Sequence, residues 1–289
     1  MNRNSLCSPH ALGHTCILLL SASSLSNALE LKPDTLQAWD EYIQTVDARL
    51  KAAPTDGKQF LWIDESPDRL RRVRAGEILV SPVGEHVPKH VPSGLIHHWM
   101  GAAFIPNTTL NNVFAVTRCY TRYKEFYKPL VIDAKLVSQT DTEDKFTMLL
   151  RNKSILSKTA LDGEYLSSYV KVDEKRWYSI SYTTRIREIK DYGEPNEREL
   201  EPDVGSGFIW RIYSSARFEE RDGGVYLEIE AVALSRDIPA AFRPLVNPIV
   251  RRLSKSSVVL SLQQTRDAVH STTGAEPTTT ATFVNTHSH

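Results

Sequence analysis

Hydrophobic and polar residues alternate most clearly over 207–220 and 225–235, which predicts a β-hairpin. A two-residue turn at Gly223–Gly224 or at Asp222–Gly223 puts the same residues on each face. One face is apolar and consists of Phe208, Trp210, Ile212, Ser214, Ala216, Phe218, Leu227, Ile229, Ala231 and Ala233. The other face carries Arg211, Tyr213, Arg217, Glu228 and Glu230. The hairpin therefore predicts a half-buried antiparallel sheet with an apolar concave side and an ion-paired convex side.

Further strand-like runs precede this hairpin, which brings the expected sheet to six or seven antiparallel strands. They are 95–105, 131–139, 144–152, 163–172 and 175–188. Tight turns are expected at Asp162–Gly163 and Asp173–Glu174. With the second turn, one face of the 163–188 hairpin holds Tyr165, Tyr169, Tyr178, Ile180 and Tyr182.

Three segments show the three-to-four spacing of amphipathic helices: 34–50, 109–127 and 248–269. On the last of these, one stripe consists of Ile249, Leu253, Ser256, Leu260 and Gln264. The middle of this stripe is small and its end is polar. Such a stripe can form the floor of a cavity, although an ordinary packed core explains its large residues equally well.

The ends of the chain differ in composition from the middle. Residues 1–28 resemble a secretory signal peptide, with a short apolar run at 16–20 and a small-residue cleavage site ending at Ala28. We therefore expect export, to the periplasm or the medium; the alternatives are a disordered leader and a misplaced start codon. Residues 29–93 are expected to form an N-terminal helix and a connector packed on a main domain at 94–269. Residues 270–289 read as a disordered tail.

Charge and motifs narrow the classes of function. Lys plus Arg and Asp plus Glu both total 35, which argues against a general nucleic-acid binder. The sequence shows no metal-site, nucleotide-binding or nucleophile motif, so we assign no catalytic residue, metal or cofactor. The adjacent His97 and His98 would point to opposite faces of a strand and cannot share a metal ion. A hydrogen-bonded interior histidine is the favoured interpretation for either.

The order of elements, together with the segments 94–99, 207–211 and 218–239, resembles the START-like (SRPBCC, or helix-grip) superfamily. The resemblance covers residues 94–269 and is greatest to bacterial START-like proteins of unestablished function. It implies an α+β fold in which a curved antiparallel sheet wraps around a long C-terminal helix, here with an additional N-terminal helix.

The resemblance also implies a cavity between sheet and helix that holds lipids, sterols, quinones or polyketides. Combined with the hairpin faces and the helix stripe, it predicts a ligand-binding set. This set is His98, Met100, Trp210, Ile212, Ser214, Phe218, Leu227, Ile229, Ala231, Leu253 and Leu260. The expected partner is thus a hydrophobic small molecule or lipid, with transient membrane contact; the oligomeric state stays open.

Three functions remain after these considerations. The first is non-catalytic binding or transport of a hydrophobic molecule such as a lipid, a quinone or a polyketide. The second is a polyketide cyclase or aromatase using the same cavity, with His98 and the tyrosines of 165–182 as candidate acids or bases. The third is a protein-interaction module that docks a partner through the 34–50 helix.

Overall fold

A computed structural model describes residues 29–52, 59–154, 157–237 and 243–274. The expected signal peptide and most of the expected tail lie outside these ranges. The first four residues of that tail are instead part of the C-terminal helix, which continues through Thr273.

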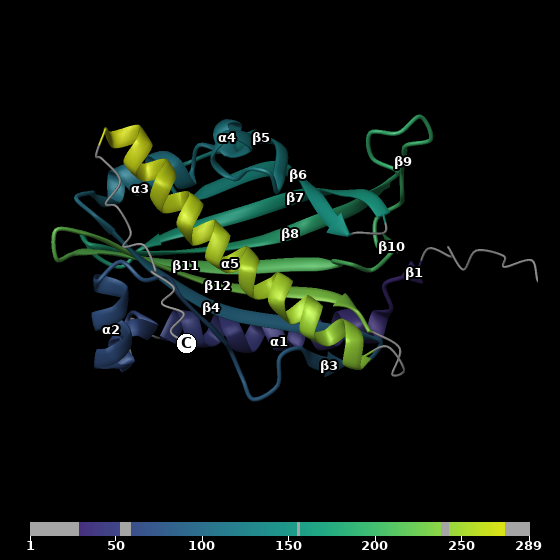
Figure 1. Cartoon of the computed structure of the whole chain (residues 1–289), viewed down its shortest axis with the longest axis horizontal. Coiled ribbons are helices and arrows are strands. Elements are labelled where there is room, and N and C mark those ends of the chain that lie inside the picture. The colour runs from purple at the N-terminus through teal and green to yellow at the C-terminus, as the bar shows by residue number, and fades with distance from the viewer. Residues whose placement is uncertain (1–28, 53–58, 155–156, 238–242, 275–289) are drawn as a thin grey trace, which may run out of the picture.

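A ten-stranded antiparallel sheet forms the centre of the molecule (Figure 1). Its main path runs in the order β2 (Leu79–Pro82), β4 (Gly94–Pro106), β12 (Gly224–Arg236), β11 (Arg211–Arg221), β8 (Arg176–Lys190), β7 (Ser157–Lys171), β6 (Glu143–Ser154) and β5 (Val131–Gln139). Two short strands join it from the side: β3 (Lys89–Val91) on β4 and β9 (Arg198–Glu199) on β8. β1 (Leu29–Glu30) and β10 (Val204–Gly205) form a separate two-stranded ribbon. The sheet is larger than the six or seven strands expected.

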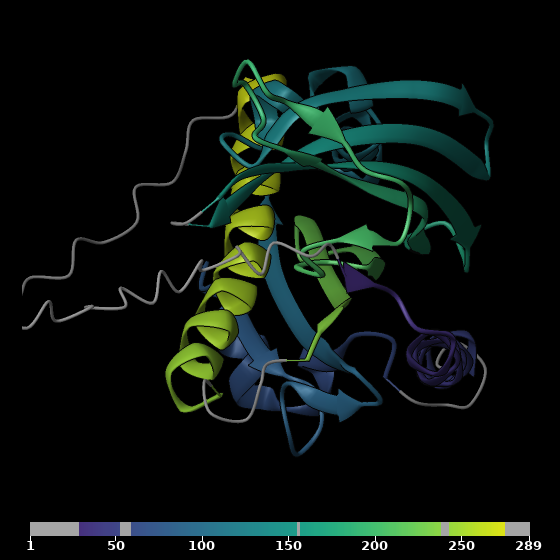
Figure 2. The ribbon, with the colours of Figure 1, turned by 90° about the vertical axis from the view of Figure 1, so that its right-hand side faces the viewer.

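The long helix α5 (Arg243–Thr273) crosses one face of this sheet, and the strands curve around it (Figures 1 and 2). Val258 and Leu262 of α5 pack against Trp99, Phe218 and Leu227 of the sheet. A curved antiparallel sheet that grips a C-terminal helix confirms the predicted α+β helix-grip fold.

Gly101 of β4 lies where the sheet and α5 approach closely. A Cβ atom there would lie 2.6 Å from Cγ1 of Val258 and 2.8 Å from Cδ1 of Leu262, both on α5. Carbon atoms do not approach so closely without repulsion, so the absence of a side chain lets α5 lie directly on the sheet.

The opposite face of the sheet is covered by the N-terminal elements (Figure 2). These are α1 (Pro33–Ala52), the short 3₁₀ helix η1 (Trp62–Glu65) and α2 (Pro67–Arg74). Trp39 and Val46 of α1 pack against Ile96, Tyr213 and Val232 of the sheet. The ion-paired side of the last hairpin is therefore buried, because the apolar stripe of α1 packs against this face of the sheet.

The hairpin of β11 and β12 turns at Asp222–Gly223, the second of the two expected turns. Both residues have positive φ (56° and 76°), as a two-residue type I′ turn requires. Phe218 pairs with Leu227 and Arg217 with Glu228. The predicted division of the hairpin into an apolar and a charged face is confirmed.

The segment expected to be one helix over 109–127 is broken into three pieces. These are α3 (Leu110–Thr117), η2 (Tyr120–Arg122) and α4 (Tyr123–Phe126). The first helix ends at Thr117, and the guanidinium of the next residue, Arg118, binds the buried carboxylate of Asp144 on β6. After the break Tyr120 points into the sheet and its ring stacks on Phe146, with 4.0 Å between ring centroids. Tertiary contacts thus outweigh the local helical pattern.

Two turn predictions are wrong. Asp162 and Gly163 lie inside β7, paired with Arg187 and Ile186. Beyond the end of β7 the backbone N–H of Val172 still donates to the Arg176 carbonyl, so the turn consists of the three residues 173–175 instead of two. The Asp173 carboxylate stabilises this turn by accepting the backbone N–H groups of Lys175 and Arg176.

One extra loop residue reverses the faces of a strand relative to its partner. Tyr169 therefore pairs with Ser179, and Tyr178 pairs with Val170 on the other face. The expectation that Tyr165, Tyr169, Tyr178 and Tyr182 share a face is wrong: only the first two face α5.

Candidate functional site

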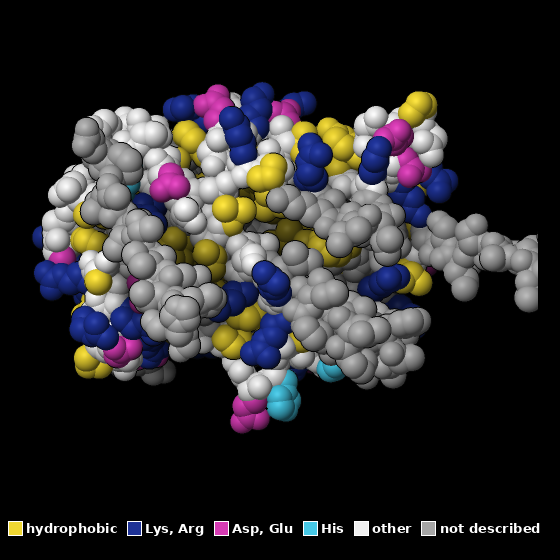
Figure 3. Space-filling model, viewed as in Figure 1, with side chains coloured by type: hydrophobic (Ala, Val, Ile, Leu, Met, Phe, Trp, Pro, Cys, Tyr) yellow, Lys and Arg dark blue, Asp and Glu magenta, His cyan; other side chains and the backbone are white. Residues whose placement is uncertain are grey.

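A cavity of about 320 Å³ lies between the sheet and the helices α4 and α5. Strands β5 to β8, β11 and β12 form its floor and walls, and α5 borders it with Leu260, Ser261, Gln264 and Thr265. The cavity opens to the surface beside α5. On that side of the molecule hydrophobic side chains gather near the middle, with Lys and Arg around them (Figure 3).

Six residues of the predicted ligand-binding set line this cavity: Ile212, Ser214, Phe218, Leu227, Ile229 and Leu260. Five of them come from the last hairpin, whose alternation directs every second side chain to the α5 side. Their contact with a ligand stays a prediction, but their common position follows from the hairpin pattern.

His98 and Met100 lie on the other side of the sheet, contrary to expectation. His98 is buried under α1, where its ring nitrogens contact the Tyr42 hydroxyl and the Glu230 carboxylate, each at 2.8 Å. Met100 borders a different hollow, beside Arg49. Both are even-numbered residues of β4, and on this strand the odd-numbered Trp99 and Ala103 are the ones that pack with α5. His98 is nevertheless a hydrogen-bonded interior histidine, as expected.

Three other predicted residues are also outside the cavity lining. Trp210 precedes β11 and packs with Trp39 and Tyr213 on the α1 side, since the strand alternation does not extend to it. Ala231 packs against the apolar cluster around Trp99, its neighbour on β4. The side chain of Leu253 lies outside the described part of the chain.

Aromatic side chains line one end of the cavity: Tyr120, Tyr123, Tyr127, Phe146, Tyr165 and Tyr169. Tyr165 and Tyr169 belong to the tyrosines considered for the cyclase alternative, whereas the other four were not predicted. Three of these tyrosines follow each other at spacings of three and four residues, which would place them on one face of the expected helix at 109–127. That spacing is the signal that could have identified them. It is also typical of ordinary core packing.

A row of serines crosses the cavity floor. Ser167 of β7, Ser181 of β8 and Ser214 of β11 are direct neighbours in the strand register. The Ser167 hydroxyl donates to that of Ser181 at 2.8 Å. These small polar residues leave space above the sheet where larger side chains would fill it.

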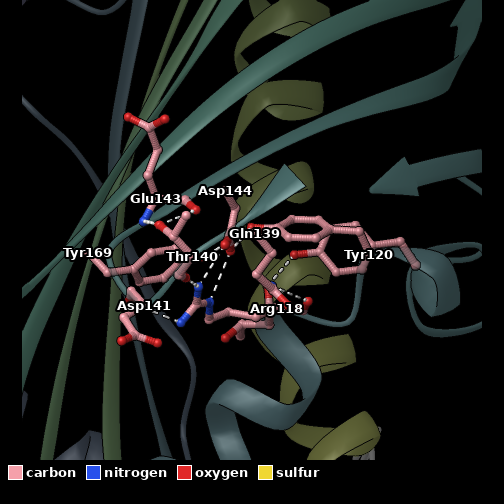
Figure 4. A network of polar contacts seen from close by, with 10 residues as sticks. Arg118, Tyr120, Gln139, Thr140, Asp141, Glu143, Asp144 and Tyr169 are labelled. Atoms are coloured by element: carbon pink, nitrogen blue, oxygen red, sulfur yellow. Dashed lines mark hydrogen bonds and ion pairs between the residues drawn. The ribbon is translucent and has the colours of Figure 1, made fainter. Parts of the chain in front are cut away.

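A buried ion pair lies at the aromatic end of the cavity (Figure 4). Asp144 is fully buried, and the Arg118 guanidinium donates to both of its carboxylate oxygens, at 2.6 and 2.9 Å. The Tyr120 hydroxyl donates to the same carboxylate at 2.8 Å. Asp144 is thus satisfied by three donors, as a charge buried away from water requires.

The Asp144 network reaches the cavity through Tyr120 and Tyr169. The hydroxyls of Tyr120 and Tyr169 are 3.1 Å apart, and the Arg118 guanidinium lies 4.4 Å from the centre of the Tyr169 ring. Burial raises the pKa of Tyr169 to about 12. Burial likewise raises the pKa of Tyr127 to about 12. Both hydroxyls therefore remain neutral at physiological pH.

Other parts of the described chain have fewer features that indicate a functional site. Among the described residues no cluster of His, Cys, Asp or Glu could hold a metal ion. No helix in those ranges has the length and apolar character needed to cross a membrane. A more polar hollow of about 1070 Å³ between the β2–β3 loop and α5 is bordered by the basic residues Lys89, Arg251, Arg252 and Lys255.

Comparisons with known proteins are limited to structure. No protein-family model matches the sequence, and no curated protein sequence matches it significantly. A STAR-related lipid transfer protein fragment from Xanthomonas axonopodis is 17% identical, with 67% of this chain and 97% of that chain covered, at a TM-score of 0.41.

Two further solved structures are similar to a comparable degree. Human STARD10 is 11% identical, with coverage of 71% of this chain and 79% of that chain and a TM-score of 0.42. The di-domain aromatase/cyclase StfQ of the steffimycin biosynthetic pathway is 12% identical, with 83% and 62% covered and a TM-score of 0.40. A lipid transfer protein and an aromatase/cyclase are thus among the solved structures to which the chain is similar.

Proposed function

We propose that this protein binds a small hydrophobic molecule in the cavity between its sheet and α5, without transforming it. The observation that carries this proposal is the lining itself: aromatic and aliphatic side chains surround the space, and a few serine and tyrosine hydroxyls face it. A mainly apolar pocket with a small number of placed polar groups is typical of ligand sites.

The size of the cavity limits its occupant. About 320 Å³ is at the lower end of the range for small-molecule sites, which suits a compact ring system or a short acyl chain. Removal of such a ligand from water contributes roughly 25 cal/mol for each Å² of apolar area buried. Phe218 and Phe146 provide broad apolar walls for this contact.

The alternative function, a cyclase or aromatase, loses its best candidate residue. His98 is separated from the cavity by the sheet and holds two hydrogen bonds on the α1 side. Tyr165 and Tyr169 do line the cavity, but burial raises the pKa of each hydroxyl, which makes it a weak acid. A binding role therefore fits the arrangement better than general acid–base catalysis.

The interaction-module alternative also meets a structural obstacle. The side chains of Trp39, Val46 and Leu50 on α1 are buried in the molecule. A partner could use this apolar stripe only after α1 had left the sheet.

Native mass spectrometry of the purified protein tests the proposed function. We expect a mass excess from a bound apolar compound, which organic extraction removes and which can be added back to the stripped protein. A protein that purifies without such a compound, and that takes up no apolar probe, would contradict the proposal.

We also propose that the protein is exported, on the strength of the signal-like composition of residues 1–28. The expected outcome is a mature protein that begins at Leu29 and occurs in the periplasmic fraction or the medium. Intact-mass measurement of the protein from its own host checks this. An unprocessed chain that begins at Met1 in the cytoplasmic fraction is the opposite result.

A further inference from the structure

The directions of the hydrogen bonds around Asp144 follow from its ion pair. The Arg118 guanidinium donates to both carboxylate oxygens, so Asp144 is an ionised group that only accepts (Figure 4). The Tyr120 hydroxyl, 2.8 Å from one of these oxygens, must therefore donate its single proton to Asp144.

Tyr169 is then left with only one role in this network. Because the Tyr120 proton is already used, the 3.1 Å contact between the two hydroxyls is a hydrogen bond only if Tyr169 donates to Tyr120. The Tyr169 oxygen, which borders the cavity, retains its acceptor capacity and has no proton left to give.

Two more tyrosines of the cavity also donate their hydroxyl protons to acceptors within the protein. The Thr265 hydroxyl donates to the Ser261 carbonyl at 2.8 Å, so Tyr127, 3.1 Å from that hydroxyl, must donate to it. The Tyr123 hydroxyl donates to the Thr117 carbonyl at 2.5 Å. Each of these protons points to a protein acceptor, and each oxygen can still accept one from a ligand.

The tyrosine end of the cavity thus offers mainly hydrogen-bond acceptors, because the protons of Tyr120, Tyr123, Tyr127 and Tyr169 are used within the protein. Tyr165, the fifth tyrosine of the lining, keeps a hydroxyl that can donate. We propose that the cavity selects hydrophobic ligands that carry a neutral donor, such as a phenol or an alcohol. A ligand whose polar atom is only a ketone or ether oxygen finds no donor at Tyr123, Tyr127 or Tyr169 and is bound less tightly. This inference rests on the proposed function and adds the chemical class of the ligand.

The physical basis is the cost of an unpaired polar atom in an apolar site. A ligand hydroxyl exchanges its bond to water for a bond to a tyrosine oxygen. An ether oxygen in the same place loses its bonds to water and faces other acceptors. The serine hydroxyls of the floor can rotate to donate or to accept, so they provide no comparable selectivity.

Titration with 2-naphthol and 2-methoxynaphthalene tests this selectivity, because the two probes share one ring system and differ in the donor. We expect 2-naphthol to bind at least about fivefold more tightly in calorimetric titrations, although the ether is the more hydrophobic of the two. Equal affinities, or tighter binding of the ether, would overturn the inference and leave the proposed function intact. If neither probe binds, both the inference and the proposed function fail.

Single variants identify the acceptor that is responsible. In at least one of Tyr123→Phe, Tyr127→Phe and Tyr169→Phe, the preference for 2-naphthol should fall to about twofold or less, because the variant lacks the acceptor oxygen. The matched control is Tyr182→Phe, on the opposite face of the sheet, which should keep the full preference. A preference that persists in all three cavity variants, each shown to be folded by circular dichroism, would contradict the assignment.

Discussion

Buried polar residues on the α1 side of the sheet hold the N-terminal helix in place. His98 links the Tyr42 hydroxyl of α1 to the Glu230 carboxylate of β12, and Arg49 of α1 forms an ion pair with the same carboxylate. Burial alone would raise the pKa of Glu230, but the His98 hydrogen bond and the Arg49 charge together hold it below its usual value. These contacts stabilise the docking of α1 and do not reach the cavity.

Replacement of His98 by Ala separates structure from ligand binding. We expect a loss of about 2–4 kcal/mol in the free energy of unfolding, because Glu230 and Tyr42 lose a buried partner. Affinity for 2-naphthol should stay within twofold of the unmodified protein. Urea denaturation and calorimetric titration measure the two quantities, and a selective loss of affinity in a stable variant would place His98 in the ligand site.

His97 gives stability a dependence on pH. Burial lowers its pKa to about 4 from an ordinary value of 6.5. Below pH 6.5 the unfolded chain takes up a proton that the folded chain refuses, so stability falls as the pH falls from 6.5 to 4. Between pH 6.5 and pH 5 this contribution amounts to about 2 kcal/mol.

The variant His97→Gln isolates this effect. Denaturation of both proteins at pH 7 and pH 5 should show a smaller acid-induced loss in the variant. Burial raises the pKa of Glu228 to about 7, so this residue contributes stability that is lost as the pH rises, opposite to His97. Because both proteins contain Glu228, its contribution cancels in the comparison. An identical pH dependence in both proteins would contradict the assignment to His97.

Strand register decides which residues reach the cavity. The alternation over β11 and β12 identifies cavity residues because either possible turn gives the same faces. In the β7–β8 hairpin the assignment of faces depends on the loop length, since a loop of three residues in place of two moves every side chain of β8 to the opposite face relative to β7. The role of the Asp173 carboxylate in that loop is not visible in a pattern of hydrophobic residues.

The break in the 109–127 segment has a similar origin. The periodicity there indicates one helix and indeed places Tyr120, Tyr123 and Tyr127 together. The buried carboxylate that binds Arg118 comes from β6, 26 residues further along the chain. A contact over that distance in the sequence cannot be inferred from local propensity.

The packing of α5 on β4 depends on Gly101. We expect Gly101→Ala to lower the free energy of unfolding by about 1–3 kcal/mol, because the added methyl group overlaps Val258 and Leu262. Combination with Val258→Ala should recover part of this loss, because that change removes the nearest methyl group. Thermal or urea unfolding of the single and double variants checks this, and strictly additive effects would contradict the proposed contact.

At the scale of the whole molecule, both faces of the sheet are covered. α5 covers the concave face and leaves a cavity, whereas α1, η1 and α2 close the convex face over buried ionic residues. The order of the elements and the resemblance to START-like proteins predicted that the sheet curves around α5. It could not show that His98 belongs to the closed face, because adjacent residues of β4 are both buried and alternation of polarity is lost there.

The most direct test of the central claim is to fill the cavity. Ser214 belongs to the row of serines on the cavity floor. The variant Ser214→Trp should therefore bind 2-naphthol at least tenfold more weakly and keep the same fold. The control variant Ser138→Trp, changed at the exposed end of β5, should bind 2-naphthol as tightly as the unmodified protein. Calorimetric titration of the three proteins is the measurement. Undiminished binding by a folded Ser214→Trp variant would show that the ligand site is not in this cavity.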